Sequence, residues 1–505
     1  MKDTTFPSDR PRAGARPISE RLAFNDRRSG RPGGSIAGIP LPSERVPTFA
    51  TAAYAEPRDW GYLGLFAFTA VLLLRPQDQV PALESLHLAE MCVLIGIGPM
   101  LLHRFAHRLP AFKVNAETIA LFLFGLVMLV GVPTSVWPSG ALGEFSDKYL
   151  KIVVVFLLMM NTLTTPARLD RLMWLILLCV GVIAAKSIVN YAQGINLVEG
   201  GRLAGAVGGI FGNPNDLALN MVTFLPLASV VALSRHRPAW RRIIAVVVAA
   251  LMVATIVLTR SRGGALGLAV ALAALMFLGR KVRPGFAIIA TLSVLAAAPM
   301  LPASFWARMN SIVDADEDAR MYTGSRAARS EVMQEGISAF LDRPITGVGV
   351  GQFKNYNPAG RDQPWLETHN AMIQVAAETG FAGLLLFVYL IVRAATAAVS
   401  ARRMLGDRRI RAPENSGVLT ASDRHALFEN TVALSAGLAG WFVCSLFASV
   451  AYNWTFYYVL ALIVAARELV TERRLAMDIS AEVVSRPTRF LTTAKVFPAR
   501  STGLA

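Results

Sequence analysis

The sequence contains little charge for its length. Only 17% of its 505 residues are Asp, Glu, Lys or Arg, whereas 54% are hydrophobic. A soluble chain carries about 25% charged residues, and one of this length divides into several domains. The shortage of charge therefore argues against a soluble protein.

Cysteine is also scarce. The three cysteines, Cys92, Cys179 and Cys444, all lie inside apolar runs. They have neither the spacing of a metal site nor the arrangement of a disulfide framework. Cysteine-based redox chemistry is therefore not expected.

Acidic residues are fewer than basic ones, which gives a formal net charge of +16. Such a charge raises the question of nucleic acid binding. However, the Lys and Arg residues cluster in short loops beside apolar runs, which is the pattern of membrane topology. We therefore expect no nucleic acid partner.

What the chain does contain is a series of apolar runs long enough to cross a bilayer. They predict an all-α, polytopic integral membrane protein with about twelve transmembrane helices, at Trp60–Leu74, Leu88–Leu102, Thr118–Val132, Leu150–Leu163, Leu172–Tyr191, Leu217–Leu233, Ile243–Leu258, Gly263–Leu278, Phe286–Leu301, Ala371–Val392, Thr431–Val450 and Trp454–Ala466.

The polar segments complete the predicted domain organisation. Residues 1–58 are rich in Arg, Pro, Gly and Ser and predict a disordered cytoplasmic tail. Spans one to nine occupy 59–301, a large outer loop occupies 302–368, spans ten to twelve occupy 369–470, and a cytoplasmic tail follows at 471–505. The excess of Lys and Arg in alternate short loops sets this orientation.

Arg260-Ser261-Arg262 lies between two spans on the predicted outer side. Arginine is normally retained on the cytoplasmic side, so this pair suggests an anionic partner. Arg202 opens a glycine-rich outer segment that leads to Asn213 and Asn215. This segment is interpreted either as a re-entrant turn or as a lining for a phosphate site, since guanidinium groups and backbone amides suit phosphate oxygens.

The outer loop carries Arg326 and Arg329, three residues apart, before an apolar pattern at helical spacing. The pattern predicts an amphipathic helix lying on the bundle, with its apolar residues at Val332, Met333, Ile337, Phe340 and Leu341. The following Gly347-Val348-Gly349-Val350-Gly351 predicts a glycine-rich turn rather than a nucleotide site.

His369 and Asn370 open the tenth span. A histidine there suits a general base, but Thr368 or Asn370 would also serve simply as a helix cap. Glu378 lies nine residues further on. A carboxylate inside a membrane suggests a pairing or functional role, so it would either neutralise an arginine or orient the site.

These features together resemble the O-antigen ligase and polymerase-like superfamily of bacterial envelope glycosyltransferases. The resemblance covers about residues 60–470 and rests on four short motifs in order, Arg202…Gly212-Asn213-Pro214-Asn215, Thr259-Arg260-Ser261-Arg262-Gly263-Gly264, Arg329 ahead of Pro344-Ile345-Thr346-Gly347-Val348-Gly349, and His369-Asn370 ahead of Glu378-Thr379-Gly380-Phe381-Ala382-Gly383.

The resemblance implies a multi-pass protein of the bacterial inner membrane with a periplasmic active site. A glycan would pass, with inversion, from undecaprenyl diphosphate to a hydroxyl of a glycan, lipid or protein acceptor. His369 would act on that hydroxyl, and Arg202, Arg262 and Arg329 would bind the diphosphate, with Arg260 and Arg326 as further ligands. Asn213, Asn215, Asn370 and Glu378 would support them. We expect neither a metal nor a nucleotide cofactor; membrane lipid is the remaining partner.

One departure and two alternatives remain. Many relatives carry Trp shortly after the loop arginine, whereas Val332 and Met333 follow Arg329, so the choice between Arg326 and Arg329 stays open. The first alternative is a secondary transporter of an anionic solute or lipid-linked sugar, although common transporters place their sites at the midplane. The second is a metal-dependent transferase that uses Asp78 or Glu84.

Overall fold

The computed structural model describes residues 59–198, 201–279, 326–356, 367–406 and 419–485. Outside these ranges lie the predicted tail 1–58, the ninth predicted span and the part of the predicted outer loop that precedes residue 326. Within them the chain is almost entirely helical, and the strands are the two-residue pair β1 (Leu197–Val198) and β2 (Arg202–Leu203). The predicted all-α membrane fold is confirmed.

A helix occupies the place of every predicted span within the described ranges. Eight helices are long and apolar enough to cross a membrane, namely α2 (Leu88–Ala106), α3 (Ala116–Gly131), α6 (Pro166–Ala192), α7 (Pro214–Leu233), α8 (Ala239–Thr259), α14 (Ala371–Gly406), α15 (Ala421–Ser445) and α16 (Trp454–Ser485). Three others are shorter, α1 (Trp60–Leu74), α5 (Lys151–Thr162) and α9 (Arg262–Leu278).

Helix α5 is short as an α-helix, but it extends a longer helical segment. That segment begins with α4 (Pro138–Glu144) and passes through a π-helical turn, η4 (Phe145–Leu150). The predicted span Leu150–Leu163 is therefore only its second half. Span eleven ends at Ser445, earlier than expected, and the chain then runs through Val450 without helix.

The ends of the helices form two different environments. At one end, ion pairs join helices that are distant in sequence. Arg393 and Arg467 both contact the buried Glu117, at 2.7 and 2.8 Å, and Arg237 contacts Asp170 at 2.6 Å. The loops predicted to be periplasmic meet at the other end of the bundle, so the two predicted groups of loops are separated in space.

Small residues allow the central helices to approach closely. α15 packs against both α7 and α9, and a Cβ added to Gly437 would lie 2.2 Å from the Thr223 carbonyl oxygen. Small residues at such contacts are typical of membrane bundles. The ring of Trp441 stacks on Phe456 at 4.6 Å in the core.

Helix α14 is broken at Gly380, which has φ 70° and ψ −166°. The preceding glycine turn docks into this break. Its amides at Val348 and Gly349 donate to the carbonyls of Ala377 and Glu378, and the Phe381 amide donates to the Pro344 carbonyl. Because lipid offers no hydrogen bonds, a break in a spanning helix requires such replacement partners. The predicted glycine turn is confirmed.

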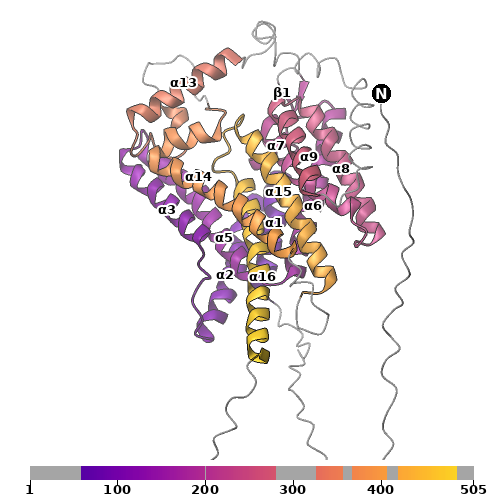
Figure 1. The fold of residues 1–505 in the computed structure, drawn as a ribbon. Helices are drawn as coiled ribbons and strands as arrows, with labels where there is room; N and C mark the ends of the chain where they lie inside the picture. The colour runs from indigo at the N-terminus through magenta and orange to yellow at the C-terminus, as the bar shows by residue number, and fades with distance from the viewer. Residues whose placement is uncertain (1–58, 199–200, 280–325, 357–366, 407–418, 486–505) are drawn as a thin grey trace, which may run out of the picture. The chain divides into compact units, whose positions relative to one another are not determined.

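The loop helix, α13 (Arg326–Asp342), lies over α14 at this end of the bundle (Figure 1). Its predicted apolar face is partly wrong. Val332 is buried, but the rest of the packed face is made of Gly336 and Ala339, while Ile337 and Leu341 are 47% and 67% exposed. A Cβ on Gly336 would lie 2.6 Å from a methyl group of Ile373, so small residues let α13 approach α14.

Candidate functional site

The turn between α8 and α9 is built by local capping. Arg260 adopts a left-handed conformation, φ 49°, and ends α8. Ser261 is the N-cap of α9, and its hydroxyl accepts from the Gly264 amide at 3.1 Å. Arg262 is the first residue of α9. Two helix ends therefore hold both arginines beside a helix N-terminus, which favours anions.

Arg202 lies against this turn and is only 7% exposed. Its Nε donates to the Thr259 carbonyl at 3.2 Å, and its Nη2 donates to the Asn215 Oδ1 at 2.9 Å. The Ser261 hydroxyl donates to the same Asn215 oxygen at 2.9 Å. Asn215 thus joins two motifs that are far apart in sequence. We call Arg202, Asn215, Arg260, Ser261 and Arg262 the arginine cluster.

Asn213 precedes α7 and caps it. Its Oδ1 accepts from the amides of Asn215 and Asp216, both at 2.9 Å. Asn213 is therefore the N-cap of α7. The cap fixes the two following side chains, with Asn215 in the arginine cluster and Asp216 in the wall of a cavity described below.

His369 has a left-handed backbone, φ 50°, just before α14. Its amide donates to the Ser449 hydroxyl at 2.9 Å. The Asn370 Oδ1 accepts from the amides of Met372 and Ile373, so Asn370 caps α14 as one interpretation predicted. The cap does not decide the role of His369, which stands one residue outside it.

The segment Leu446–Ser449 links the arginine cluster to His369. On one side, the ring of Phe447 packs against Gly263, the residue after Arg262. On the other, the Leu446 carbonyl accepts from Asn370 at 3.3 Å, and Ser449 accepts from His369. Both predicted parts of the site therefore contact one short segment.

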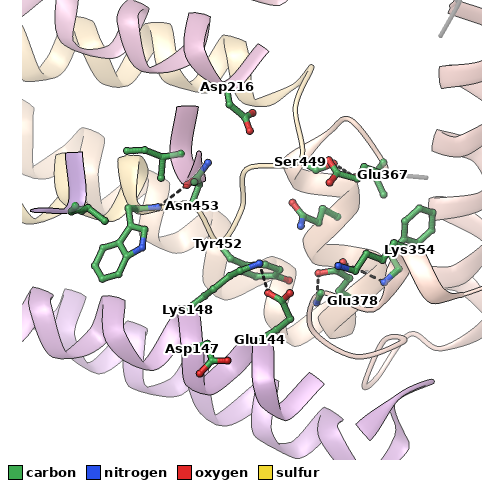
Figure 2. Close-up of a pocket in the computed structure, with 18 of the residues that line it drawn as sticks. Glu144, Asp147, Lys148, Asp216, Lys354, Glu367, Glu378, Ser449, Tyr452 and Asn453 are labelled. Carbon is green, nitrogen blue, oxygen red and sulfur yellow. Dashed lines mark hydrogen bonds and ion pairs between the residues drawn. The ribbon is translucent and has the colours of Figure 1, made fainter. Parts of the chain in front are cut away.

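A cavity of about 470 Å³ opens beside this segment (Figure 2). Asp216 enters it from α7, Glu144 and Lys148 from the 138–150 segment, and Glu367 and Glu378 from the chain before and within α14. Thr368 and Ser449, the neighbours of His369, also line it. The cavity therefore adjoins His369, although Arg202, Arg260 and Arg262 do not line it.

Five carboxylates line the cavity together with three cations, Arg75, Lys148 and Lys354. Glu144 forms an ion pair with Lys148 at 2.6 Å. Burial raises the pKa of Glu367 above its usual range, against the opposing effect of Lys354 and Lys148. Removing water from a carboxyl group disfavours its charged form, which accounts for the direction of this shift.

Among the side chains that the structure describes, Glu378 forms no ion pair with an arginine, in contrast to one of the two predicted roles. Its carboxylate accepts hydrogen bonds from the amides of Gly351 and Phe353, at 2.9 and 3.4 Å, and it also interacts with the Tyr452 hydroxyl. The carboxylate therefore ties the glycine turn to α14, because an ionised carboxylate only accepts hydrogen bonds. This contact agrees with the second predicted role of Glu378, orienting the site, which stays a prediction.

Asp78, one of the two carboxylates named in the metal-dependent alternative, already has hydrogen-bonding partners in the protein. It pairs with Arg75 at 2.6 Å and accepts from the Gly208 amide at 2.9 Å. Burial raises the pKa of Asp78, but these two contacts outweigh it and hold the pKa below its usual range. Asp78 therefore connects the first outer loop to the glycine-rich segment that follows Arg202.

Arg326 and Arg329 begin α13, but their side chains are outside what the structure describes. Which of the two arginines binds the diphosphate stays an open prediction.

A family model described as O-antigen ligase matches residues 247–388. Over these residues the chain is similar to the O-antigen ligase family. The matched region contains the α8–α9 turn, α13 and the break in α14. A search of curated proteins finds no match. The match supports, in general terms, the role of a membrane glycosyltransferase of the ligase or polymerase type.

Sequence reasoning did not find most of the cavity. Glu144, Lys148 and Tyr452 lie outside the matched region and stand in segments that look like ordinary membrane-surface loops. The one available signal was the density of paired charges at 144–151, Glu-Phe-Ser-Asp-Lys-Tyr-Leu-Lys, which is unusual beside an apolar span.

Proposed function

We propose that the protein is a glycosyltransferase of the bacterial inner membrane. It transfers or polymerises a glycan from undecaprenyl diphosphate onto an acceptor hydroxyl at the periplasmic face, without a metal and with inversion. The observation that carries the proposal is the Leu446–Ser449 segment, which contacts both the arginine turn and His369.

The proposed reaction is a single displacement. His369 takes the proton of the acceptor hydroxyl as its oxygen attacks the anomeric carbon of the donor sugar. The bond from that carbon to the phosphate oxygen breaks, and its electron pair leaves with the lipid diphosphate. Arg262, Arg202 and an arginine of α13, Arg326 or Arg329, stabilise the charge that develops on the diphosphate; Arg260 lies beside them.

The arrangement of Arg202 supports this assignment. Hydrogen bonds to Thr259 and Asn215 fix its guanidinium before any ligand arrives. Positioned cations stabilise a developing charge without the cost of reorganisation. Residues in the first turns of α7, α14 and α16 line the cavity, whereas the transporter alternative calls for a midplane site.

The test is transfer by the purified full chain in lipid, supplied with a defined undecaprenyl-diphosphate glycan. We expect His369→Ala to lower the rate about 10²- to 10⁴-fold and Arg262→Ala about 10²- to 10³-fold. Arg108→Ala, on the predicted cytoplasmic side, is the matched control and should transfer normally.

Wild-type rates in both site variants would refute the assignment, and loss of activity with a chelator would refute metal independence. The size distribution of the products separates a single transfer from polymerisation. Movement of the intact lipid-linked sugar across the bilayer without transfer would favour the transporter alternative.

A further inference from the structure

The cavity and the arginine cluster differ sharply in charge. Five carboxylates face three cations in the cavity, and one of those cations, Lys148, is already paired with Glu144. A diphosphate placed there would meet groups of its own sign, which costs several kcal/mol. The cavity therefore does not suit the anionic donor, although it adjoins the residues next to His369.

The neutral lining of the cavity suits hydroxyl groups. Gln374, Ser449 and Asn453 provide amide and hydroxyl groups, and Trp454 provides an aromatic surface. Such a mixture of an apolar ring with a few polar groups is typical of small-molecule sites, as is a volume of a few hundred Å³. A carboxylate accepts several hydrogen bonds and a sugar hydroxyl donates one, so the two are complementary.

Tyr452 also forms part of the cavity wall. The residue is only 8% exposed and lines the cavity. Its hydroxyl is buried and interacts with the Glu378 carboxyl group. Like Trp454, Tyr452 therefore adds aromatic surface to the polar lining.

We propose that this cavity is the acceptor subsite and that it takes a glycan end made of neutral, hydroxyl-rich sugars. A sugar end that carries a carboxylate or a phosphate would be rejected, because it would be desolvated among Glu144, Glu367 and Asp216. The inference rests on the proposed function, since it assigns the partner of the donor. It also places the acceptor beside Ser449, which holds the His369 amide.

The test is photo-cross-linking of the purified full chain in lipid. The probes are a diazirine-tagged chitotetraose, which is neutral, and an equally tagged tetragalacturonate, which is anionic. Peptide mapping by mass spectrometry follows the label in residues 446–454. We expect the neutral probe to label this peptide about tenfold more strongly than the anionic one.

Variants separate binding from folding. Asn453→Ala, which removes a polar group from the cavity lining, should reduce labelling by the neutral probe. Glu367→Gln should narrow the difference in labelling between the two probes. Glu472→Gln, at an exposed residue paired with Lys113, is the matched control and should change neither. Each variant is first checked for an unchanged elution profile, and Glu144→Gln replaces Glu367→Gln if the latter does not fold.

Equal labelling by both probes, or no labelling of residues 446–454 by the neutral probe, would overturn the inference. This readout does not depend on transfer. If His369→Ala abolishes transfer while the probes label the cavity alike, the acceptor assignment fails and the proposed function stands. If only the neutral probe labels the cavity but the site variants transfer normally, the site assignment of the proposed function fails instead.

Discussion

Replacing Glu378 with alanine should lower the free energy of unfolding, and the hydrogen bonds that the Glu378 carboxylate accepts determine by how much. Glu378 is 4% exposed and accepts from the amides of Gly351 and Phe353, at 2.9 and 3.4 Å. The substitution leaves two buried donors without an acceptor, and each such donor costs about 1–3 kcal/mol. Because the second bond is long, we expect a loss near the lower end, about 2–4 kcal/mol in total.

The assay is a thermal series in one detergent, in which size-exclusion chromatography measures the fraction of protein that stays monodisperse. Glu378→Gln should fall between wild type and Glu378→Ala, because an amide keeps one acceptor oxygen but presents a donor in place of the other. Glu472→Ala, which removes an exposed ion pair, should cost about 0–1 kcal/mol and serves as the control.

A direct chemical role would give a different pattern. If Glu378→Ala melted like wild type and still lost transfer, the carboxylate would be acting on a substrate and not on the glycine turn. The structural reasoning would then be wrong, and Glu378 would join His369 as a reacting group.

Three further predictions follow from single contacts. Gly380→Ala should lower the free energy of unfolding by about 1–3 kcal/mol from its backbone conformation alone, and the added Cβ would also clash with the carbonyl oxygens of Pro344 and Ile345 at 2.6 Å. Gly98→Ala, where no atom lies within 4 Å of the added Cβ, is the control. Equal melting temperatures of the two variants would contradict this reasoning. Arg202→Lys should lower the transfer rate about tenfold or more, since a single ammonium cannot bridge Thr259 and Asn215 as the planar fork does; a wild-type rate would count against the cluster. Glu367→Gln should raise the melting temperature at pH 8, because a raised folded-state pKa makes ionisation of Glu367 unfavourable to folding. The gain in melting temperature should vanish as the pH falls below 4.5, the ordinary pKa of a glutamate. A gain that persists at pH 4 would exclude this cause.

The membrane fold was predictable because it depends on the lengths of apolar runs. The bilayer fixes that length, so the predicted span Trp60–Leu74 coincides with α1. The cap at Asn370 could also be predicted, since it depends on residues only two or three positions away. The sequence therefore predicted structure correctly where the interacting residues are close in the chain, or where the bilayer determines the pattern of apolar residues.

The rest depended on contacts that leave no periodic signal. The packed face of α13 uses Gly336 and Ala339, which a search for large apolar residues passes over. The partners of Glu378 are backbone amides, and any residue type can offer an amide. The cavity collects carboxylates from segments between Glu144 and Glu378, so only the folded chain reveals their common position.

The break in α14 also affects the order in which the chain assembles in the membrane. The turn that completes the break precedes the helix, and Gly351 lies 27 residues before its partner Glu378. During synthesis the turn therefore leaves the ribosome first. Because unsatisfied backbone groups in hydrocarbon cost several kcal/mol each, the first half of α14 becomes fully stable only once the turn has docked. A chain stalled before that step should hold a shorter span that starts at Phe381. Docking of the turn is then required before α14 reaches its full length behind His369.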